Sequence, residues 1–434
     1  MKQREPGTGD RAPSHSGKGT PPVRSTRVSG LRTPAPGPRA AGRGPRISWA
    51  SPLPPTRSGV ADYAAELLPE LALLAKVTVV EPPEWSPPPD ATWLSALARV
   101  NDASDEEHGV PLLHLGNNPY HLWVARRLRR RGGVVVLHDP VLHHLLVEEA
   151  AADGAWDRFT RELGEAHGAA GMALAEARRW GLTGSLDPFL FPARQVYLRG
   201  ARAVIVHSLW AQRRLAAELP EVPVRRVPLA VAQLPQGDRA GWRHRLGCGE
   251  NTLVLAHLGF LTPAKGLETL LRALAAMNEL RLDFRLVVVG EGSEGSAFDR
   301  EVAALGLGDR VMRWGFASLE DLGGIVAATD LGLVPRYPTA GETSAAALRF
   351  LASGTPVVVA GYGQFLELPP DAAARMAPGR DGVVDLVRWA AVLAADPLAR
   401  RAARDAAGRV WRDGGHAPEI AARSLLAALA EVAA

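Results

Sequence analysis

The chain has 434 residues, of which 47% are hydrophobic and 22% are charged, and its formal net charge is +4. This composition is typical of a globular protein with two or three domains, and no apolar run approaches the ~18 residues of a membrane span. One cysteine, Cys248, excludes an internal disulfide framework, and the N-terminus lacks the apolar segment of a secretory signal. We therefore expect a cytoplasmic protein.

The positive charge is concentrated near the N-terminus. Residues 1–46 hold ten Lys and Arg against two acids, a balance of +8, which leaves −4 for the rest of the chain. Residues 1–45 contain almost no large apolar residue, so we expect a disordered tail. Two interpretations of the tail remain open, a solvated extension and a weak peripheral contact with the anionic inner face of a membrane. The acidic body gives no indication of nucleic-acid binding.

From Ile47 onward, short apolar runs of strand length alternate with longer helical patterns. Continuous apolar strands separated by helices predict parallel sheets that are covered on both faces. The predicted strands are Ile47–Ala50, Val77–Val80, Leu112–Leu115, Val134–Leu137, Ala203–Val206, Val224–Leu229, Leu253–Leu258, Phe284–Val289, Val311–Trp314, Leu331–Val334 and Pro356–Ala360.

The stretch Ala232–Arg245 contains Pro and Gly and has no strong periodicity, so we place a joint there. The fold class is then α/β, with two doubly wound Rossmann-like domains at residues 46–232 and 233–434. Packing of the last helix against the first domain is an alternative that remains open. Ligands of such sheets bind at the carboxyl ends of the strands, which directs attention to the loops that follow them.

Two candidate loops lie in the first domain. Ser51–Gly59 precedes a helix predicted to start near Val60, where Ser58 and Gly59 could meet an anion at free N–H groups. A plain Pro-rich turn capped by Ser58 is the alternative. The segment Leu137–His144 ends a buried strand, and its histidines and Asp139 do not share one helical face. We favour His138 pointing into a cleft over a metal site.

The loop Gly259–Gly266 follows a predicted strand, forms a turn and leads through Lys265 into a predicted helix. A cation at a helix N-terminus opposes the helix dipole, which is tolerable if an anion is bound there. The alternative is a solvated lysine. The following Gly290–Gly295 matches G-x-G-x-x-G formally, but no acid stands at the end of the next strand to hold a ribose. We interpret it as a tight turn into a helix.

The loop Arg336–Ser344 follows another buried strand. A glutamate at 342 would be favoured in the first turn of a helix for capping alone, without any role in binding. The same position allows a carboxylate to accept hydrogen bonds from sugar hydroxyls while the helix N-terminus binds a phosphate.

Together these loops resemble the family 4 retaining glycosyltransferases, which have the GT-B fold of two facing Rossmann-like domains around a cleft. The resemblance runs from about Ile47 to the C-terminus. It rests on SPLPPTRSGVADY (Ser51–Tyr63), HLGNNPYH (His114–His121), VVVLHDPVLHH (Val134–His144), GFLTPAKGLETL (Gly259–Leu270) and RYPTAGETSAAALRFLASGTPVVVAGYGQFLELP (Arg336–Pro369).

The resemblance implies a role for each loop. The loop ending at Gly59 lies against the donor diphosphate, and His138 lies by the donor sugar. Lys265 neutralises the diphosphate, and Glu342 holds the sugar. The remaining donor-binding candidates are Ser58, Gly259, Arg336, Thr343 and Ser344. The family implies that no metal is needed, and the nucleoside-diphosphate sugar is a substrate, so no cofactor is expected.

Two positions depart from the family pattern. Phe260 stands where an Arg usually follows the glycine, and Arg349 stands where the second of two glutamates is usual. The first glutamate falls on Gly341, next to Glu342. These changes weaken the expected ribose and phosphate contacts, and Arg336 is a candidate for the missing positive charge.

We therefore predict a retaining hexosyltransferase that uses a nucleotide sugar and a saccharide or lipid-linked acceptor, in cell-surface polysaccharide or glycolipid assembly. Two other functions remain open. A nucleotide-sugar epimerase would need a set of acids in the cleft, for which few candidates exist. A degenerate sugar-binding or partner-binding scaffold is supported by Phe260 and Arg349.

Overall fold

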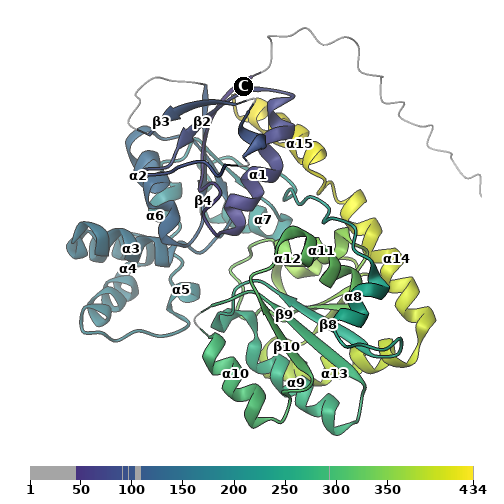
Figure 1. Ribbon diagram of the computed structural model, residues 1–434. Coiled ribbons are helices and arrows are strands. Elements are labelled where there is room, and N and C mark those ends of the chain that lie inside the picture. Colours follow the sequence, from purple (N-terminus) through teal and green to yellow (C-terminus); the bar gives the residue numbers. More distant parts are fainter. Residues whose placement is uncertain (1–44, 90, 96, 103–108, 293, 434) are drawn as a thin grey trace, which may run out of the picture. The chain divides into compact units, whose positions relative to one another are not determined.

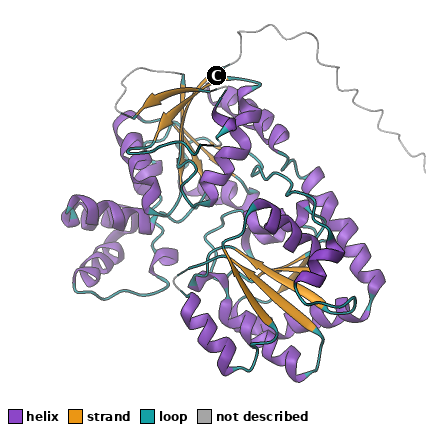
Figure 2. Ribbon diagram, viewed as in Figure 1, coloured by secondary structure: helices purple, strands orange, loops and turns teal. Residues whose placement is uncertain are grey.

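The computed structural model describes residues 45–89, 91–95, 97–102, 109–292 and 294–433. The predicted tail lies outside these residues, apart from Pro45. Two sheets form the framework, one of seven strands and one of six, and every strand pair is parallel (Figures 1 and 2). The predicted fold class of two doubly wound α/β sheets is confirmed.

The strand order is β3-β2-β1-β4-β5-β6-β7 in the first sheet and β10-β9-β8-β11-β12-β13 in the second. The strands are β1 (Arg46–Ala50), β2 (Lys76–Glu81), β3 (Ala98–Asn101), β4 (Val110–Leu115), β5 (Val134–Leu137), β6 (Ala203–Val206), β7 (Val224–Arg226), β8 (Leu253–Leu258), β9 (Phe284–Val289), β10 (Val311–Gly315), β11 (Leu331–Val334), β12 (Val357–Ala360) and β13 (Ala373–Met376).

The sequence missed β3 and β13, which are two of the four edge strands of the sheets, and found the other two, β7 and β10. An edge strand is covered on fewer sides, so it does not need the continuous apolar run that marks a central strand. β3 accordingly has the sequence ARVN and is largely exposed, whereas all six residues of β8 are buried.

Helices cover both faces of each sheet (Figure 2). They are α1 (Gly59–Ala72), α2 (Leu122–Arg131), α3 (His143–Asp153), α4 (Trp156–Arg179, with a break at Gly168), α5 (Asp187–Leu190), α6 (Gln195–Leu198), α7 (Leu209–Glu218), α8 (Arg239–Arg245), α9 (Leu267–Glu279), α10 (Gly295–Ala304), α11 (Leu319–Ala328), α12 (Ala345–Ala352), α13 (Gly382–Ala395), α14 (Pro397–Asp413) and α15 (Pro418–Ala433). Within the described ranges, no helix has the length and apolar character needed to cross a membrane.

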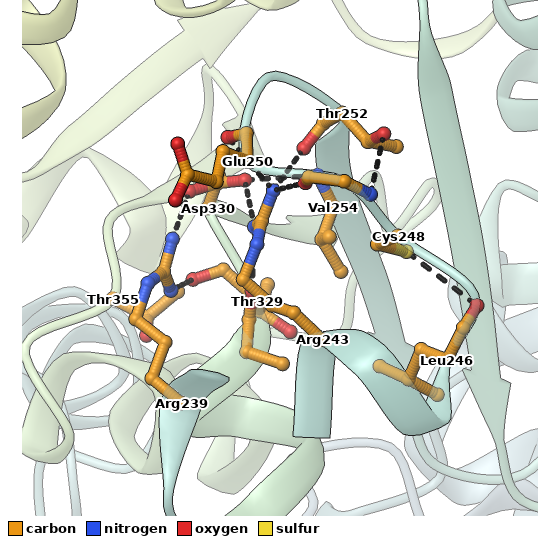
Figure 3. A network of polar contacts seen from close by, with 12 residues as sticks. Arg239, Arg243, Leu246, Cys248, Glu250, Thr252, Val254, Thr329, Asp330 and Thr355 are labelled. Atoms are coloured by element: carbon orange, nitrogen blue, oxygen red, sulfur yellow. Dashed lines mark hydrogen bonds and ion pairs between the residues drawn. The ribbon is translucent and has the colours of Figure 1, made fainter. Parts of the chain in front are cut away.

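The stretch read as an irregular joint contains a helix. Asp238 caps α8 by accepting from the backbone N–H groups of Ala240 and Gly241. The helix is then tied to the second sheet through the buried Asp330, which pairs with Arg239 at 2.5 Å and with Arg243 at 3.0 Å (Figure 3). Sequence periodicity missed α8 because these ion pairs, rather than an apolar stripe, fix it in place.

Each sheet has one point where its strand order reverses, between β1 and β4 and between β8 and β11. In doubly wound sheets this reversal opens a crevice at the carboxyl ends of the strands. Three of the predicted loops, after β1, β8 and β11, start at these points, and His138 follows the neighbouring β5. At the end of the chain, α15 packs against α1 (Figure 1).

Candidate functional site

The loop after β1 leads directly into α1. Ser58 is the N-cap, and its hydroxyl accepts from the backbone N–H of Ala61 at 3.1 Å. Gly59 begins the helix, and nothing lies within 4 Å of the place where a side chain would point. The capping role predicted for Ser58 is therefore present, and the helix start beside Gly59 has open space for a ligand.

The loop after β8 brings Lys265 beside Gly259. Lys265 ends a short 3-10 turn (Pro263–Lys265), and α9 starts two residues later, so the lysine precedes the helix rather than occupying its first turn. Its Nζ lies 3.5 Å from the position that a Cβ on Gly259 would take. It still lies at the positive end of α9, where an anion is favoured.

Close backbone contact fixes this loop against the loop after β11. The N–H of Tyr337 donates to the carbonyl of Ala264 at 3.0 Å. Gly266 has a φ of +70°, and a Cβ there would lie 2.0 Å from the carbonyl oxygen of Pro335. A glycine is therefore required at 266, and the two loops form one surface.

Lys265 is half-buried and lies among charged groups. Burial lowers its pKa well below the usual range, and nearby Arg336 lowers it further, while Asp139 acts in the opposite direction. Burial raises the pKa of Asp139 to about 6, against the hydrogen bond from Val141 and the charges of Arg336 and Lys265. Asp139 follows β5 of the first sheet, so groups from both sheets meet at this point.

Glu342 is already engaged by its own loop. It forms an ion pair with Arg336, and its Oε2 accepts from the Thr339 hydroxyl and the Ala340 N–H, both at 2.9 Å. The side chain of Gln364 donates to the carbonyl of Glu342 at 2.9 Å. The carboxylate is thus held in one orientation beside the cations rather than serving as a helix cap.

The start of α12 lies slightly later than the sequence indicates. Ser344 is its N-cap and accepts from the N–H of Ala347 at 3.2 Å, so Glu342 lies outside the first turn. The hydroxyl of Thr343 is buried without a hydrogen-bond partner. Both residues line a cavity of about 350 Å³ together with His207 and Gln364.

A larger cavity of about 560 Å³ lies at the carboxyl ends of β8, β9 and β10. Ser58, Gly259 and Phe260 line it, together with Phe316, and the acidic side chains of Asp62, Glu66 and Glu291 complete the wall. Its volume and aromatic lining suit a planar heterocycle attached to a sugar. Of the predicted site residues, the structure places Ser58 and Gly259 in this wall and Lys265 beside Gly259.

Arg349 also lines this cavity, and its charge is compensated from the other sheet. It forms an ion pair with Glu66 of α1. A carboxylate is therefore present near this position although the chain has Arg at residue 349. Phe260 is about half exposed and adds apolar surface in place of a cation.

His138 lies at the edge of a group of aromatic rings. Its Nε2 is 2.9 Å from Nδ1 of His114, and its ring lies 4.8 Å from that of Tyr63 and 5.0 Å from that of His207. Burial, followed by the nearby His207, lowers the pKa of His138 well below its ordinary value. His138 is therefore a neutral ring at neutral pH.

Sequence reasoning missed several of these side chains. Asp139 was considered only as a metal ligand. His114 and Gln364 lie inside motifs that were quoted for the resemblance, but neither they nor Glu66 were assigned a role. A histidine inside the apolar end of β4 was the one available signal for His114. Among the described residues, no group of three or more His, Cys, Asp or Glu side chains is arranged to hold a metal ion.

One family model matches a segment in the second half of the chain. The profile described as glycosyl transferases group 1 matches residues 252–396, which include Lys265, Arg336 and Glu342. In this segment the chain is similar to the group 1 glycosyltransferases. The D-inositol 3-phosphate glycosyltransferase of Segniliparus rotundus is 34% identical over 131 residues, 29% of each chain. The alpha-D-kanosaminyltransferase of Streptomyces kanamyceticus is 31% identical over 163 residues, 36% of this chain and 42% of that protein. The matched segment is thus less than half of either relative's length.

Solved structures share the fold of nearly the whole chain. The sucrose-phosphate synthase of Thermosynechococcus elongatus superposes with a TM-score of 0.62 at 18% identity, over 90% of this chain and 99% of that one. Anabaena HepE in complex with UDP and glucose gives 0.61 at 17% identity, over 89% and 100%. The fold predicted from the resemblance, GT-B, is confirmed.

Proposed function

We propose that this protein is a group 1 glycosyltransferase, a retaining, metal-independent enzyme that moves a hexose from a nucleoside-diphosphate sugar to an acceptor hydroxyl. The observation that supports it most is the position of Lys265, which feels the charge of Arg336 and lies beside Gly259 in the wall of a nucleoside-sized cavity. Both cations lie at the order reversal of the second sheet, where ligands of doubly wound sheets bind.

An anion bound beside the two cations would stabilise their charges. Burial and the charge of Arg336 both disfavour the protonated form of Lys265. Arg336 itself forms an ion pair with Glu342. A diphosphate beside Gly259 would supply the opposing charge. Negative charge grows on that group as the glycosidic bond breaks, so Lys265 stabilises the transition state more than the ground state.

The larger cavity would then take the nucleoside. A base can lie against Phe316 and Phe260, and the open start of α1 at Gly59 faces the same cavity through Ser58. HepE, which shares the fold, was crystallised with UDP and glucose. UDP-sugars are therefore the first donors to test.

The proposed chemistry needs no enzyme nucleophile. The acceptor hydroxyl attacks from the face that the diphosphate leaves, its oxygen forms the new glycosidic bond, and its proton passes to the departing phosphate. Lys265 and the helix N-termini carry the charge. His138 and Glu342 orient the sugar through hydrogen bonds.

The acceptor is proposed to be a saccharide or a lipid-linked saccharide in cell-surface assembly. Residues 1–45 would add weak contact with an anionic membrane. Deleting them should reduce binding to anionic vesicles, more so at low salt, and leave the melting temperature unchanged. A large loss of stability would contradict the tail's proposed independence.

A thermal-shift panel of UDP-, GDP-, ADP- and TDP-sugars tests the donor. A ligand at 100 times its dissociation constant stabilises the fold by ~2.7 kcal/mol, which such a panel detects. The anomeric configuration of the product tests retention, and an unchanged rate in chelator tests metal independence. No shift with any nucleotide sugar would contradict the proposal.

A second function is a scaffold that binds a nucleotide sugar without turnover. Phe260 and the pairing of Arg349 with Glu66 favour it, because both remove side chains that the family uses. Donor binding with no transfer to any acceptor and no hydrolysis would support the scaffold.

A further inference from the structure

The buried histidines share one hydrogen-bond pattern. Five of them place Nδ1 within 2.8–3.1 Å of a backbone carbonyl oxygen. A carbonyl can only accept, so each Nδ1 carries the hydrogen and each Nε2 has a bare lone pair. The pairs are His121 with His114, His143 with Phe191, His207 with Val227, His257 with Leu333 and His416 with Leu229.

His114 has the same buried, unpartnered Nε2, but its Nδ1 meets another ring. That Nδ1 lies 2.9 Å from Nε2 of His138, and Trp49 packs on the His114 ring with 3.9 Å between centroids. Either nitrogen of this contact could carry the hydrogen. If His138 were the donor, His114 would hold its own hydrogen on Nε2, as a buried N–H without an acceptor.

An orphaned buried N–H is rare in proteins, whereas an unused lone pair is tolerated more often. His114 is therefore the donor, and Nε2 of His138 is the acceptor. A doubly protonated His114 is disfavoured because the ring is buried and faces the rings of His207 and His121, which lower its pKa.

We infer that His114 is a positioning residue that fixes His138 as the tautomer with hydrogen on Nδ1. Nε2 of His138 is then occupied, and Nδ1 is the atom left for a ligand. His138 is half-exposed, and within the described part of the chain Nδ1 has no hydrogen-bond partner and is not buried.

The inference assigns a chemical role to His138. A neutral ring with Nδ1–H toward the cleft donates to an oxygen lone pair, and it cannot take a proton there. Only this step rests on the proposed transferase function. In that enzyme His138 donates to a sugar or phosphate oxygen and does not act as a base.

Nitrogen-15 NMR of the histidine-labelled full chain tests the tautomer directly, because the protonated and bare ring nitrogens resonate apart. His138→Gln assigns the resonance, and His244→Gln, at an exposed site, is the matched control. We expect hydrogen on Nδ1 of His138 at neutral pH. Hydrogen on Nε2 would overturn the inference. The measurement needs no donor, so it is independent of the transferase proposal.

Two substitutions test the role of His114. His114→Asn keeps an N–H donor near Nδ1 and should keep the His138 tautomer, whereas His114→Leu should give a mixture. If a transfer assay is in hand, His114→Leu should lower kcat/KM by roughly 10-fold, with most of it restored in His114→Asn. An unchanged tautomer in a folded His114→Leu protein would overturn the positioning role. If His114→Leu fails to fold, the spectra of wild type and His114→Asn still show which ring nitrogen of His138 carries the hydrogen.

Discussion

Arg349 of α12 forms an ion pair with Glu66 of α1, and the other carboxylate oxygen of Glu66 accepts from the N–H of Ala232 at 2.8 Å. One glutamate thus connects a helix of the first sheet, the segment between the sheets and a helix of the second. The Arg349 and Glu66 side chains are 13% and 16% exposed, so most of the pair is shielded from water.

Removing one partner of this pair should destabilise the protein. Arg349→Leu leaves Glu66 charged and partly buried, which should lower the free energy of unfolding by about 2 kcal/mol. The double variant Arg349→Leu/Glu66→Leu should lose less than the sum of the single changes. Urea unfolding measures both.

The exposed pair of Arg272 and Glu268 on α9 is the matched control. Both side chains are about half exposed, so Arg272→Leu should cost less than ~1 kcal/mol. Equal costs at the two sites would show that the Arg349 pair has no special role.

Stability should depend on the buried histidines. Burial lowers the pKa of His121, His143 and His207 to about 4, from 6.5. Between these values the unfolded chain binds protons that the folded chain does not, so the free energy of unfolding falls as pH falls. The slope is ~1.4 kcal/mol per pH unit for each fully titrating histidine.

Asp139 opposes this trend, because its raised pKa of about 6 lets the folded state take up a proton first. His257, whose pKa burial lowers to about 3, acts with the three histidines, and Asp62, whose pKa burial raises, acts with Asp139. The histidines outnumber these two carboxyls, so we expect a net loss of stability as the pH is lowered below 6.5. Urea unfolding at a series of pH values measures it. A free energy that stays flat or rises over that range would contradict the assignment of these rings as neutral.

Gly341 should be intolerant of any side chain. Its φ is +97°, and a Cβ would lie 2.0 Å from the ring of Trp210 on α7. Gly341→Ala should displace the loop that holds Glu342, with a loss of roughly 2–4 kcal/mol and weaker donor binding.

Gly306 is the control, since its φ is +65° but nothing lies within 4 Å of its Cβ position. Gly306→Ala should lose only the cost of the left-handed backbone, ~1–2 kcal/mol, and should keep donor binding. Similar effects at both sites would show that contact with Trp210 is unimportant.

Most strands that the sequence predicted lie inside a sheet, where burial on both faces requires a continuous apolar run. The edge strands β7 and β10 were also predicted, although β10 has no fully buried residue. The edge strands β3 and β13 lack an apolar run and were missed. The loop positions followed from strand ends, so Lys265 and Arg336 could be placed near one another. Interactions between the two sheets, such as the ion pair of Arg349 with Glu66 or the charge of Asp139 acting on Lys265, could not be predicted. They depend on how distant elements pack, and no local pattern records them.

Lys265 is proposed to stabilise the leaving diphosphate. The only other lysine in the described part of the chain, Lys76, is exposed at the start of β2 and serves as the matched control. Because Arg336 lies close enough to share the charge, the loss in Lys265→Ala should fall nearer the lower end of the 10²–10³ range for one preorganised group.

The deciding measurement is the steady-state kcat/KM of sugar transfer for wild type, Lys265→Ala and Lys76→Ala, with melting temperatures as a folding control. We expect a loss of roughly 10²-fold for Lys265→Ala, carried mainly by kcat, and none for Lys76→Ala. Near-wild-type transfer by a folded Lys265→Ala protein would contradict the account.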